Sequence, residues 1–188
     1  MDAALFALIN GWAGRSVLLD AAGRILGSDF FAPSILTLIL VAMWFEEESA
    51  GSGFRRLAFR VVVAVLLANV IVAVLNLVYP RPRPFSTLPA QVLTYRPSDP
   101  SFPSNAAAVA AVFPAVIWAR SPRLAWPMGL LAFIFSFARV FVGVHYPLDI
   151  VTGWLVGWSS ARLAWRLDRR LHPLFDGLSE AAERLGLV

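Results

Sequence analysis

Five long apolar runs, separated by short polar connections, dominate the chain after residue 28. Within each run the hydrophobic residues lie on all sides of a helical repeat, which is typical of helices buried in lipid or in a protein interior. The runs that predict membrane-spanning helices are Phe30–Phe45, Leu57–Tyr79, Ser104–Ala119, Leu124–Val144 and Pro147–Trp165. Some fall short of the roughly 20 apolar residues that a span requires, so a soluble all-α protein with buried helices is the alternative.

The two ends of the chain show a different pattern. In residues 1–28, Arg15, Asp20 and Arg24 are spaced among apolar positions, which predicts a helix lying in the membrane interface. No basic residue precedes its apolar stretch, so we expect this helix to be retained rather than removed as a signal peptide. Residues 167–188, which include His172, predict an amphipathic cytoplasmic tail, and the glutamate run at residues 46–48 predicts a solvated loop.

The one long connection is residues 80–103, which contains seven prolines and is too rich in proline to form a long helix. We therefore predict a single all-α domain over residues 1–188. It would be a polytopic membrane helix bundle with about five transmembrane helices and an N-terminal interfacial helix.

Composition and charge strengthen the membrane prediction. The chain is 59% hydrophobic, contains no cysteine, and has a net charge of +4 with arginine as its only basic residue type apart from histidine. Without cysteine, disulfides and thiolate metal sites are excluded. Cytoplasmic loops are enriched in basic residues, and alternate connections on one side hold eight arginines. They are Arg55, Arg56, Arg120, Arg123, Arg162, Arg166, Arg169 and Arg170. The 80–103 connection and the turn at His145 should then face outward.

Polar residues that suit a phosphate converge on this external side. Arg83 and Arg139 are the natural pair, because each guanidinium can donate two hydrogen bonds to adjacent phosphate oxygens. For Arg81 and Arg83 the alternative is a role as interfacial anchors. Arg139 lies within an apolar run, where an unpaired charge is costly, and this position favours a functional role.

Two further motifs complete the predicted site. In "FPSN", Ser104 can cap the next helix, which would aim unpaired N–H groups at an external anion, although capping alone also explains the serine. In "HYPLD", Pro147 suits the first helical position. Asp149 then lies in the first turn, where we expect its carboxylate to hold the imidazole of His145 as a nucleophile or base. A structural histidine is the alternative.

These motifs resemble the three signatures of the type 2 phosphatidic acid phosphatase superfamily: Arg83-Pro84, Pro103-Ser104, and Arg139-x5-His145-x3-Asp149. "RPRPF" and "SFPSN", with Asn105, are most similar to its bacterial undecaprenyl pyrophosphate phosphatase branch. The resemblance implies a six-helix core in the bacterial plasma membrane with its site on the outer face. It also implies that His145 attacks phosphorus, that Asp149 orients it, and that Arg83, Arg139 and Ser104 hold the phosphate without metal or cofactor.

The chain departs from the family pattern at two positions. The lysine that usually opens the first motif is replaced by Asn76, for which Arg81 could compensate. The histidine that serves the family as general acid is replaced by Ala106, which predicts an impaired form. Because the neighbours of Ala106 fit the motif, we expect a deliberate substitution, and a naturally disabled relative is the alternative.

The sequence thus predicts a phosphatase that converts polyprenyl pyrophosphate to the monophosphate, with lipid as its partner and no nucleic acid. Hydrolysis of phosphatidic acid or phosphatidylglycerophosphate is the enzymatic alternative, because it would use the same phosphate-binding residues. A non-catalytic lipid-phosphate binder or flippase is the alternative from another class, and the missing general acid at Ala106 favours it.

Overall fold

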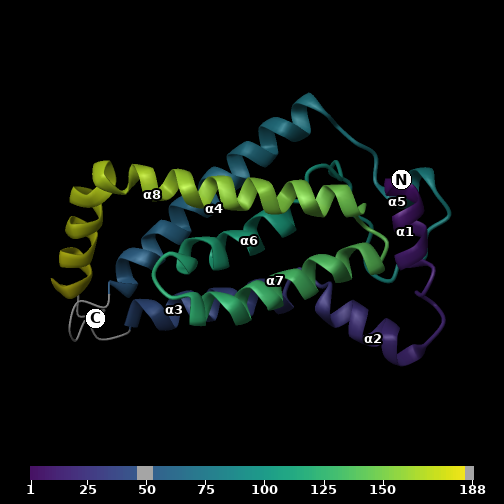
Figure 1. Cartoon of the computed structure of the whole chain (residues 1–188), viewed down its shortest axis with the longest axis horizontal. Helices are drawn as coiled ribbons and strands as arrows, with labels where there is room; N and C mark the ends of the chain where they lie inside the picture. The colour runs from purple at the N-terminus through teal and green to yellow at the C-terminus, as the bar shows by residue number, and fades with distance from the viewer. Residues whose placement is uncertain (46–52, 185–188) are drawn as a thin grey trace.

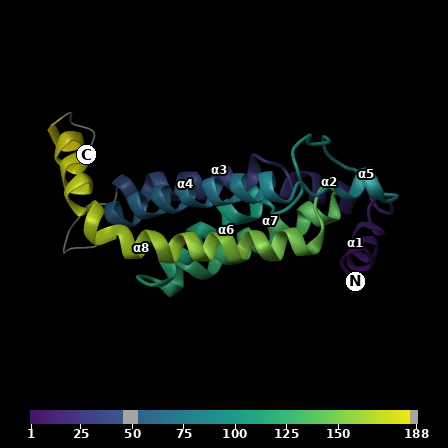
Figure 2. The same ribbon diagram turned by 90° about the horizontal axis from the view of Figure 1, so that it is seen from above.

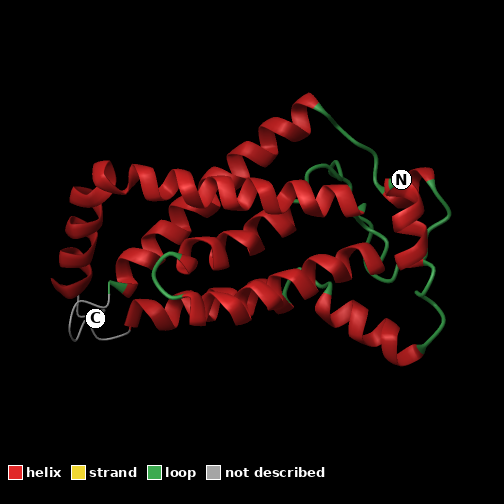
Figure 3. Ribbon diagram, in the orientation of Figure 1, coloured by secondary structure: helices red, strands yellow, loops and turns green. Residues whose placement is uncertain are grey.

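Helices form where the apolar runs predict them. The structure, a computed structural model, describes residues 1–45 and 53–184, and within these ranges it contains helices and loops but no strand (Figure 3). The glutamate run at residues 46–48 and the last four residues lie outside the described ranges. The helices are α1 Asp2–Asn10, α2 Val17–Leu26, α3 Phe31–Phe45, α4 Phe54–Val78, α5 Pro84–Thr87, α6 Asn105–Trp118, α7 Pro122–Phe141 and α8 Pro147–Arg184.

The apolar helices pack around α6. This short helix contacts α4, α7 and α8, and α3 lies along the bundle against α4, α6 and α7 (Figures 1 and 2). Burying α6 on several sides suits its composition, because ten of its fourteen residues are buried, nearly all of them aliphatic or aromatic. These contacts hold α6 in place, and its N-terminus, which follows Ser104, lies at one end of the bundle.

Glycines let α8 approach α6 closely. A Cβ built at Gly153 would lie 2.6 Å from the carbonyl oxygen of Ser104, and one at Gly157 would lie 2.4 Å from the carbonyl oxygen of Ala108. Small residues at helix interfaces permit such backbone contact, which membrane helices use in place of bulky interdigitation. The contact fixes the start of α6 against the first turns of α8.

The membrane character of the bundle follows from helix length and composition. Helices α4 and α7 are long and apolar enough to cross a bilayer, and α2 with α3, which meet at an angle of 41°, form a third candidate span. Exposed leucine, valine and phenylalanine side chains cover these helices, among them Leu66, Val70 and Phe133. The predicted all-helical membrane bundle is confirmed, but against the five spans expected, two of the described helices, or three with the bent pair, have the length and composition of a span.

The N-terminal segment differs from the single helix expected over residues 1–28. It forms two helices, α1 and α2, joined by a turn that contains Gly14 at a φ of +80°. Ser16 then caps α2 by accepting a hydrogen bond from the amide of Leu19. The left-handed conformation of Gly14 and the cap at Ser16 end one helix and start the next. The spacing of apolar residues does not indicate this break.

The tail predicted from residue 167 onward begins inside the last helix. Helix α8 continues from Pro147 to Arg184 and bends sharply in its C-terminal part (Figure 1). Pro173 lies inside the helix, and proline is the residue type that produces such bends.

The connection between α4 and α6 is held to the α7–α8 turn by backbone hydrogen bonds. It contains one helical turn, α5, and is otherwise irregular. The amide of Leu93 donates to the carbonyl of Val142 at 3.2 Å, and the amide of Ser104 donates to the carbonyl of Asp149 at 3.0 Å. These bonds bring the segments that carry Arg83 and His145 together.

Candidate active site

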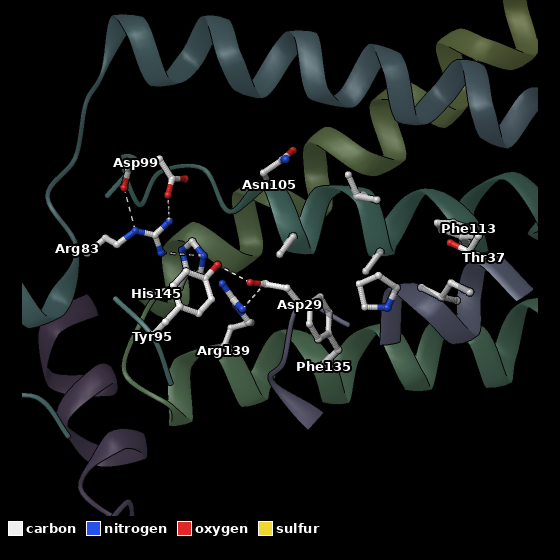
Figure 4. Close-up of a pocket in the computed structure, with 15 residues that line it drawn as sticks. Asp29, Thr37, Arg83, Tyr95, Asp99, Asn105, Phe113, Phe135, Arg139 and His145 are labelled. Carbon is white, nitrogen blue, oxygen red and sulfur yellow. Dashed lines mark hydrogen bonds and ion pairs between the residues drawn. The ribbon is translucent and has the colours of Figure 1, made fainter. Parts of the chain in front are cut away.

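A pocket of about 330 Å³ opens where these segments meet. It receives residues from the α2–α3 link, the α4–α6 connection, the start of α6, the end of α7 and the α7–α8 turn (Figure 4). Its polar lining residues are Asp29, Thr37, Arg83, Tyr95, Asp99, Asn105, Arg139 and His145. The remaining wall is apolar and includes Leu36, Phe113 and Phe135.

The turn that carries His145 depends on a glycine. Gly143 has a φ of +88°, and a Cβ there would lie 2.6 Å from the carbonyl oxygen of Gln91. Both the left-handed conformation and the close approach of the neighbouring backbone require glycine. The chain can therefore turn sharply after α7 and present His145 just before Pro147 starts α8, as predicted.

Hydrogen bonds determine the tautomer of His145, which is buried. Its Nδ1 lies 3.0 Å from the carbonyl oxygen of Ser101. A carbonyl only accepts hydrogen bonds, so Nδ1 carries the proton and Nε2 keeps its lone pair. Nε2 lies 3.3 Å from Nη1 of Arg83. The ring is thus oriented with its unprotonated nitrogen beside the guanidinium of Arg83.

The carboxylate of Asp149 is not the acceptor that was expected for the imidazole. Its Oδ2 lies 3.7 Å from Nδ1 of His145, beyond hydrogen-bond distance, and instead accepts a bond of 2.8 Å from the amide of Tyr146. The reason is local geometry: in the first turn of α8 the carboxylate caps the helix, while the loop supplies the Ser101 carbonyl. Asp149 acts on the imidazole through its charge.

Burial and charge together keep His145 neutral. Burial lowers the pKa of the imidazole from its ordinary value of 6.5, the positive charges of Arg83 and Arg139 lower it further, and Asp149 opposes them. A histidine attacks phosphorus only in its neutral form. The acidic limb of any activity that depends on His145 should therefore lie below pH 6.5.

Both pocket arginines are buried and already paired with carboxylates. Arg83 donates from Nη2 to Asp99 at 3.0 Å, and Arg139 donates from Nη1 to Asp29 at 2.6 Å. Tyr95 donates its hydroxyl hydrogen to the other oxygen of Asp29, and this bond is the main reason that the pKa of Tyr95 is raised. A phosphate that binds here must compete with Asp29 and Asp99 for the two guanidinium groups.

Arg139 retains one unsatisfied donor. Its side chain is 3% exposed, and its Nε–H has no hydrogen-bond partner among the residues that the structure describes. Buried donors without partners are rare because they lose the hydration they had in the unfolded chain. An oxyanion in the pocket could accept a hydrogen bond from this Nε–H and another from the guanidinium of Arg83.

Replacing Asp99 with asparagine should strengthen the binding of phosphate or vanadate by roughly 2–5-fold, because the exposed carboxylate no longer competes for Arg83. The Asp99 side chain is 60% exposed, which keeps the expected gain small. Calorimetric titration with vanadate measures it. Asp176→Asn, which changes a carboxylate on the distant part of α8, is the matched control. Unchanged or weaker binding by Asp99→Asn would contradict competition at Arg83.

The structure brings together only part of the predicted site. Arg83, Arg139, His145, Asn105 and Ala106 line the pocket. Four other predicted residues do not line it, one of which is Asp149, buried behind His145. Ser104 is buried and caps α6 by accepting from the amide of Ala107, Asn76 lies on α4, and Arg81 pairs with carboxylates outside the pocket.

Among the pocket residues that the sequence did not predict are the three that form the carboxylate pairs of the two arginines: Asp29, its partner Tyr95, and Asp99. None belongs to a recognisable motif. One signal could have found the two aspartates, since each buried arginine requires a counterion and both aspartates lie in connections expected near the same end of the bundle.

Comparisons with known proteins identify the family of the chain. The family model that matches the chain is the PAP2 superfamily, over residues 57–173. The undecaprenyl-diphosphatase of Sulfolobus acidocaldarius is 35% identical over 109 residues, which cover 56% of this chain and 53% of the relative. The chain thus spans about half the length of that protein.

Two further comparisons extend over most of the chain. The undecaprenyl-diphosphatase BcrC of Bacillus subtilis is 27% identical over 176 residues, which cover 94% of this chain and 89% of the relative. The crystal structure of LpxE from Aquifex aeolicus superposes with a TM-score of 0.71 at 25% identity, and the match covers 88% of this chain and 94% of that one.

Proposed function

The chain belongs to the PAP2 superfamily, and from that premise we propose that it hydrolyses polyprenyl pyrophosphate, such as undecaprenyl pyrophosphate, to the monophosphate. The family model, the undecaprenyl-diphosphatase relatives and the apolar helices support the coarser description of a membrane-embedded lipid phosphatase. The observation that carries the mechanistic proposal is the placement of His145, with Nδ1 committed to the Ser101 carbonyl and Nε2 beside Arg83 in one pocket.

In the proposed reaction Arg83 and Arg139 hold the terminal phosphate. The lone pair on Nε2 of His145 attacks phosphorus, and the bond from phosphorus to the bridging oxygen breaks, so that the electron pair leaves with the lipid monophosphate. Water then attacks the phosphohistidine, the N–P bond breaks, inorganic phosphate departs, and Nε2 regains its lone pair. The proton released by the attacking water passes to solvent.

Ala106 supports the choice of a pyrophosphate substrate. It lines the pocket at the family's general-acid position but has no proton to give, so the leaving oxygen must depart without protonation by this residue. A lipid phosphate is a stable anion and departs far more readily in this way than the alkoxide of a phosphate monoester. The apolar wall formed by Leu36, Phe113 and Phe135 supports a lipid as the group attached to the phosphate.

The test is release of inorganic phosphate by the purified protein from undecaprenyl pyrophosphate, phosphatidylglycerophosphate and phosphatidic acid. We expect the fastest release from the pyrophosphate, inhibition by vanadate, and no effect of EDTA. Equal or faster release from a monoester would contradict the proposed substrate. No release from any lipid, even with protein equimolar to substrate, would favour a lipid-phosphate binder.

The same assay tests the orientation. We propose that the 80–103 connection lies outside the bacterial plasma membrane, as the distribution of arginines predicts, and that the pocket opens there. Intact spheroplasts should then hydrolyse added farnesyl pyrophosphate, a water-soluble substrate that does not cross the membrane. Hydrolysis seen only after the spheroplasts are lysed would reverse the orientation.

A further inference from the structure

Arg81, the extra arginine of "RPRPF", lies outside the pocket between two carboxylates. Its Nη2 is 2.7 Å from Oδ2 of Asp2 and its Nη1 is 2.7 Å from Oδ1 of Asp149. Its guanidinium also lies over the ring of Tyr146, 3.8 Å from the centroid. Two ion pairs and a stacking contact hold this arginine in a single orientation.

Asp149 depends on Arg81 for charge compensation. Its side chain is fully buried, and Oδ2 is occupied by the amide of Tyr146 while Oδ1 faces Arg81. A buried carboxylate whose cationic partner is removed leaves an uncompensated negative charge. In this case that charge would stand 3.7 Å from Nδ1 of His145.

Arg81 also supports the other group that faces Nδ1. Its backbone carbonyl accepts a hydrogen bond of 2.9 Å from the amide of Ser101, whose own carbonyl lies 3.0 Å from Nδ1 of His145. One residue therefore supports both neighbours of the ring nitrogen, one through its side chain and the other through its backbone. A substitution at position 81 changes only the first of these supports.

Asp2 connects α1 to this arrangement. Its Oδ1 accepts a hydrogen bond of 2.9 Å from the amide of Leu148, and its Oδ2 pairs with Arg81. Phe6, fully buried in α1, packs against the ring of Tyr146 with centroids 5.6 Å apart. Helix α1 is thus fastened to the first turn of α8, directly behind His145.

We propose that Arg81 is a positioning residue for His145, that it acts by neutralising Asp149, and that Asp2 holds it in place. This inference rests on the proposed function only in that His145 is the nucleophile. It assigns to Arg81 a role behind the nucleophile in place of the direct phosphate contact expected from the sequence. It also makes helix α1 part of the catalytic apparatus.

The charges around His145 determine the effect of losing Arg81. The ionic groups that face His145 are Arg83 at Nε2, Arg139 across the pocket, and Asp149 behind Nδ1. Arg83 and Arg139 remain when Arg81 is replaced, but the negative charge of Asp149 is no longer balanced. The pKa of His145 should therefore rise, so that more of the imidazole is protonated and unable to attack at a given pH.

The chain contains two histidines, His145 and His172, which allows a direct test by NMR. With ¹⁵N-labelled histidine in micelles, Arg81→Gln should raise the pKa of His145 and leave that of His172 unchanged. Arg81→Lys, which keeps the charge, should restore most of the parent titration. Arg96→Gln, at an exposed position of the same connection, is the matched control. A His145 titration in Arg81→Gln identical to that of the parent would overturn the role of Arg81.

Asp2 is tested by combining substitutions. If Asp2 acts through Arg81, Asp2→Asn should alter the His145 titration in the parent chain and change nothing further in the Arg81→Gln chain. Additive effects, or no effect of Asp2→Asn alone, would overturn its role. If Arg81→Gln fails to fold, the Asp2→Asn titration still decides, because a parent-like titration of His145 in Asp2→Asn would reject the proposal.

Turnover provides a second readout. In an active form of the chain, Arg81→Gln should lower kcat roughly 10–100-fold with little change in KM, as for other residues that orient a reactive group from behind. A rise in KM alone would instead indicate direct phosphate binding by Arg81. The NMR titration needs no turnover, so a failure of the proposed phosphatase function leaves the test of Arg81 intact.

Discussion

Replacing Ala106 with histidine is expected to raise the turnover of lipid phosphates by roughly 10²–10⁴-fold, the usual contribution of a general acid. Ala106 is half-buried in the first turn of α6 and lines the same pocket as Arg83, Arg139 and His145. An imidazole at this position would extend from a capped, well-packed helix toward the phosphate site. It could give its proton to the leaving oxygen and later accept one from the attacking water.

The gain should depend on the leaving group. A monoester leaves as an alkoxide and needs the proton most, whereas a pyrophosphate leaves as a lipid phosphate and needs it less. Phosphate release from phosphatidic acid should therefore increase more than release from undecaprenyl pyrophosphate. Ala106→Gln is the matched control, since glutamine is similar in size and cannot act as an acid. Background turnover by Ala106→His on every lipid, in a folded protein that still binds vanadate, would replace the phosphatase proposal with that of a binder.

Replacing His145 with glutamine in the Ala106→His form should reduce turnover by roughly 10⁴-fold or more, because removing a covalent nucleophile abolishes the pathway that depends on it. Glutamine preserves much of the volume of a buried side chain, so vanadate binding by Arg83 and Arg139 should survive in weakened form. Labelling with a substrate that carries ³²P in its terminal phosphate, quenched in alkali because the N–P bond of a phosphohistidine is labile in acid, should detect a phosphoenzyme before the substitution and none after it.

The chain supplies its own control for this experiment. His172, the other histidine, is 44% exposed and pairs with Asp176 on the distant part of α8. His172→Gln should leave both turnover and phosphoenzyme labelling unchanged. If His145→Gln retained more than a few per cent of the turnover, the phosphohistidine would be wrong and attack by activated water would be the better mechanism.

Most helix positions could be predicted from the apolar runs. The expected start of the last helix at Pro147 agrees with α8, and the expected runs from Phe30 and Ser104 agree with α3 and α6 to within one residue at their starts. Proline and serine signal helix starts through local chemistry. The division of residues 1–28 into two helices could not be predicted from the apolar pattern, because it depends on the left-handed turn at Gly14, whose amide donates to Asp20, and on the cap at Ser16.

The site was predictable to a smaller extent. Arg83, Arg139 and His145 meet in the pocket as their motifs predict, although their roles in catalysis stay predictions. The acceptor for His145 is the backbone carbonyl of Ser101. Every residue has such a carbonyl, so the residue types in the sequence could not identify this one. The orientation of the Arg81 side chain could not be predicted either, because an irregular proline-rich segment has no helical or strand periodicity from which to infer which way a side chain points.

The glycine contact between α6 and α8 limits how this protein can be changed by selection or by engineering. Glycine-to-alanine substitution inside a helix ordinarily stabilises by about 1 kcal/mol, and Gly177 has space for the added methyl. At Gly153 the same methyl would press on the carbonyl of Ser104, whose amide is bonded to Asp149. Because this oxygen belongs to the backbone and cannot move aside cheaply, the substitution should cost stability, and it should also displace the start of α6, where Ala106 lines the pocket.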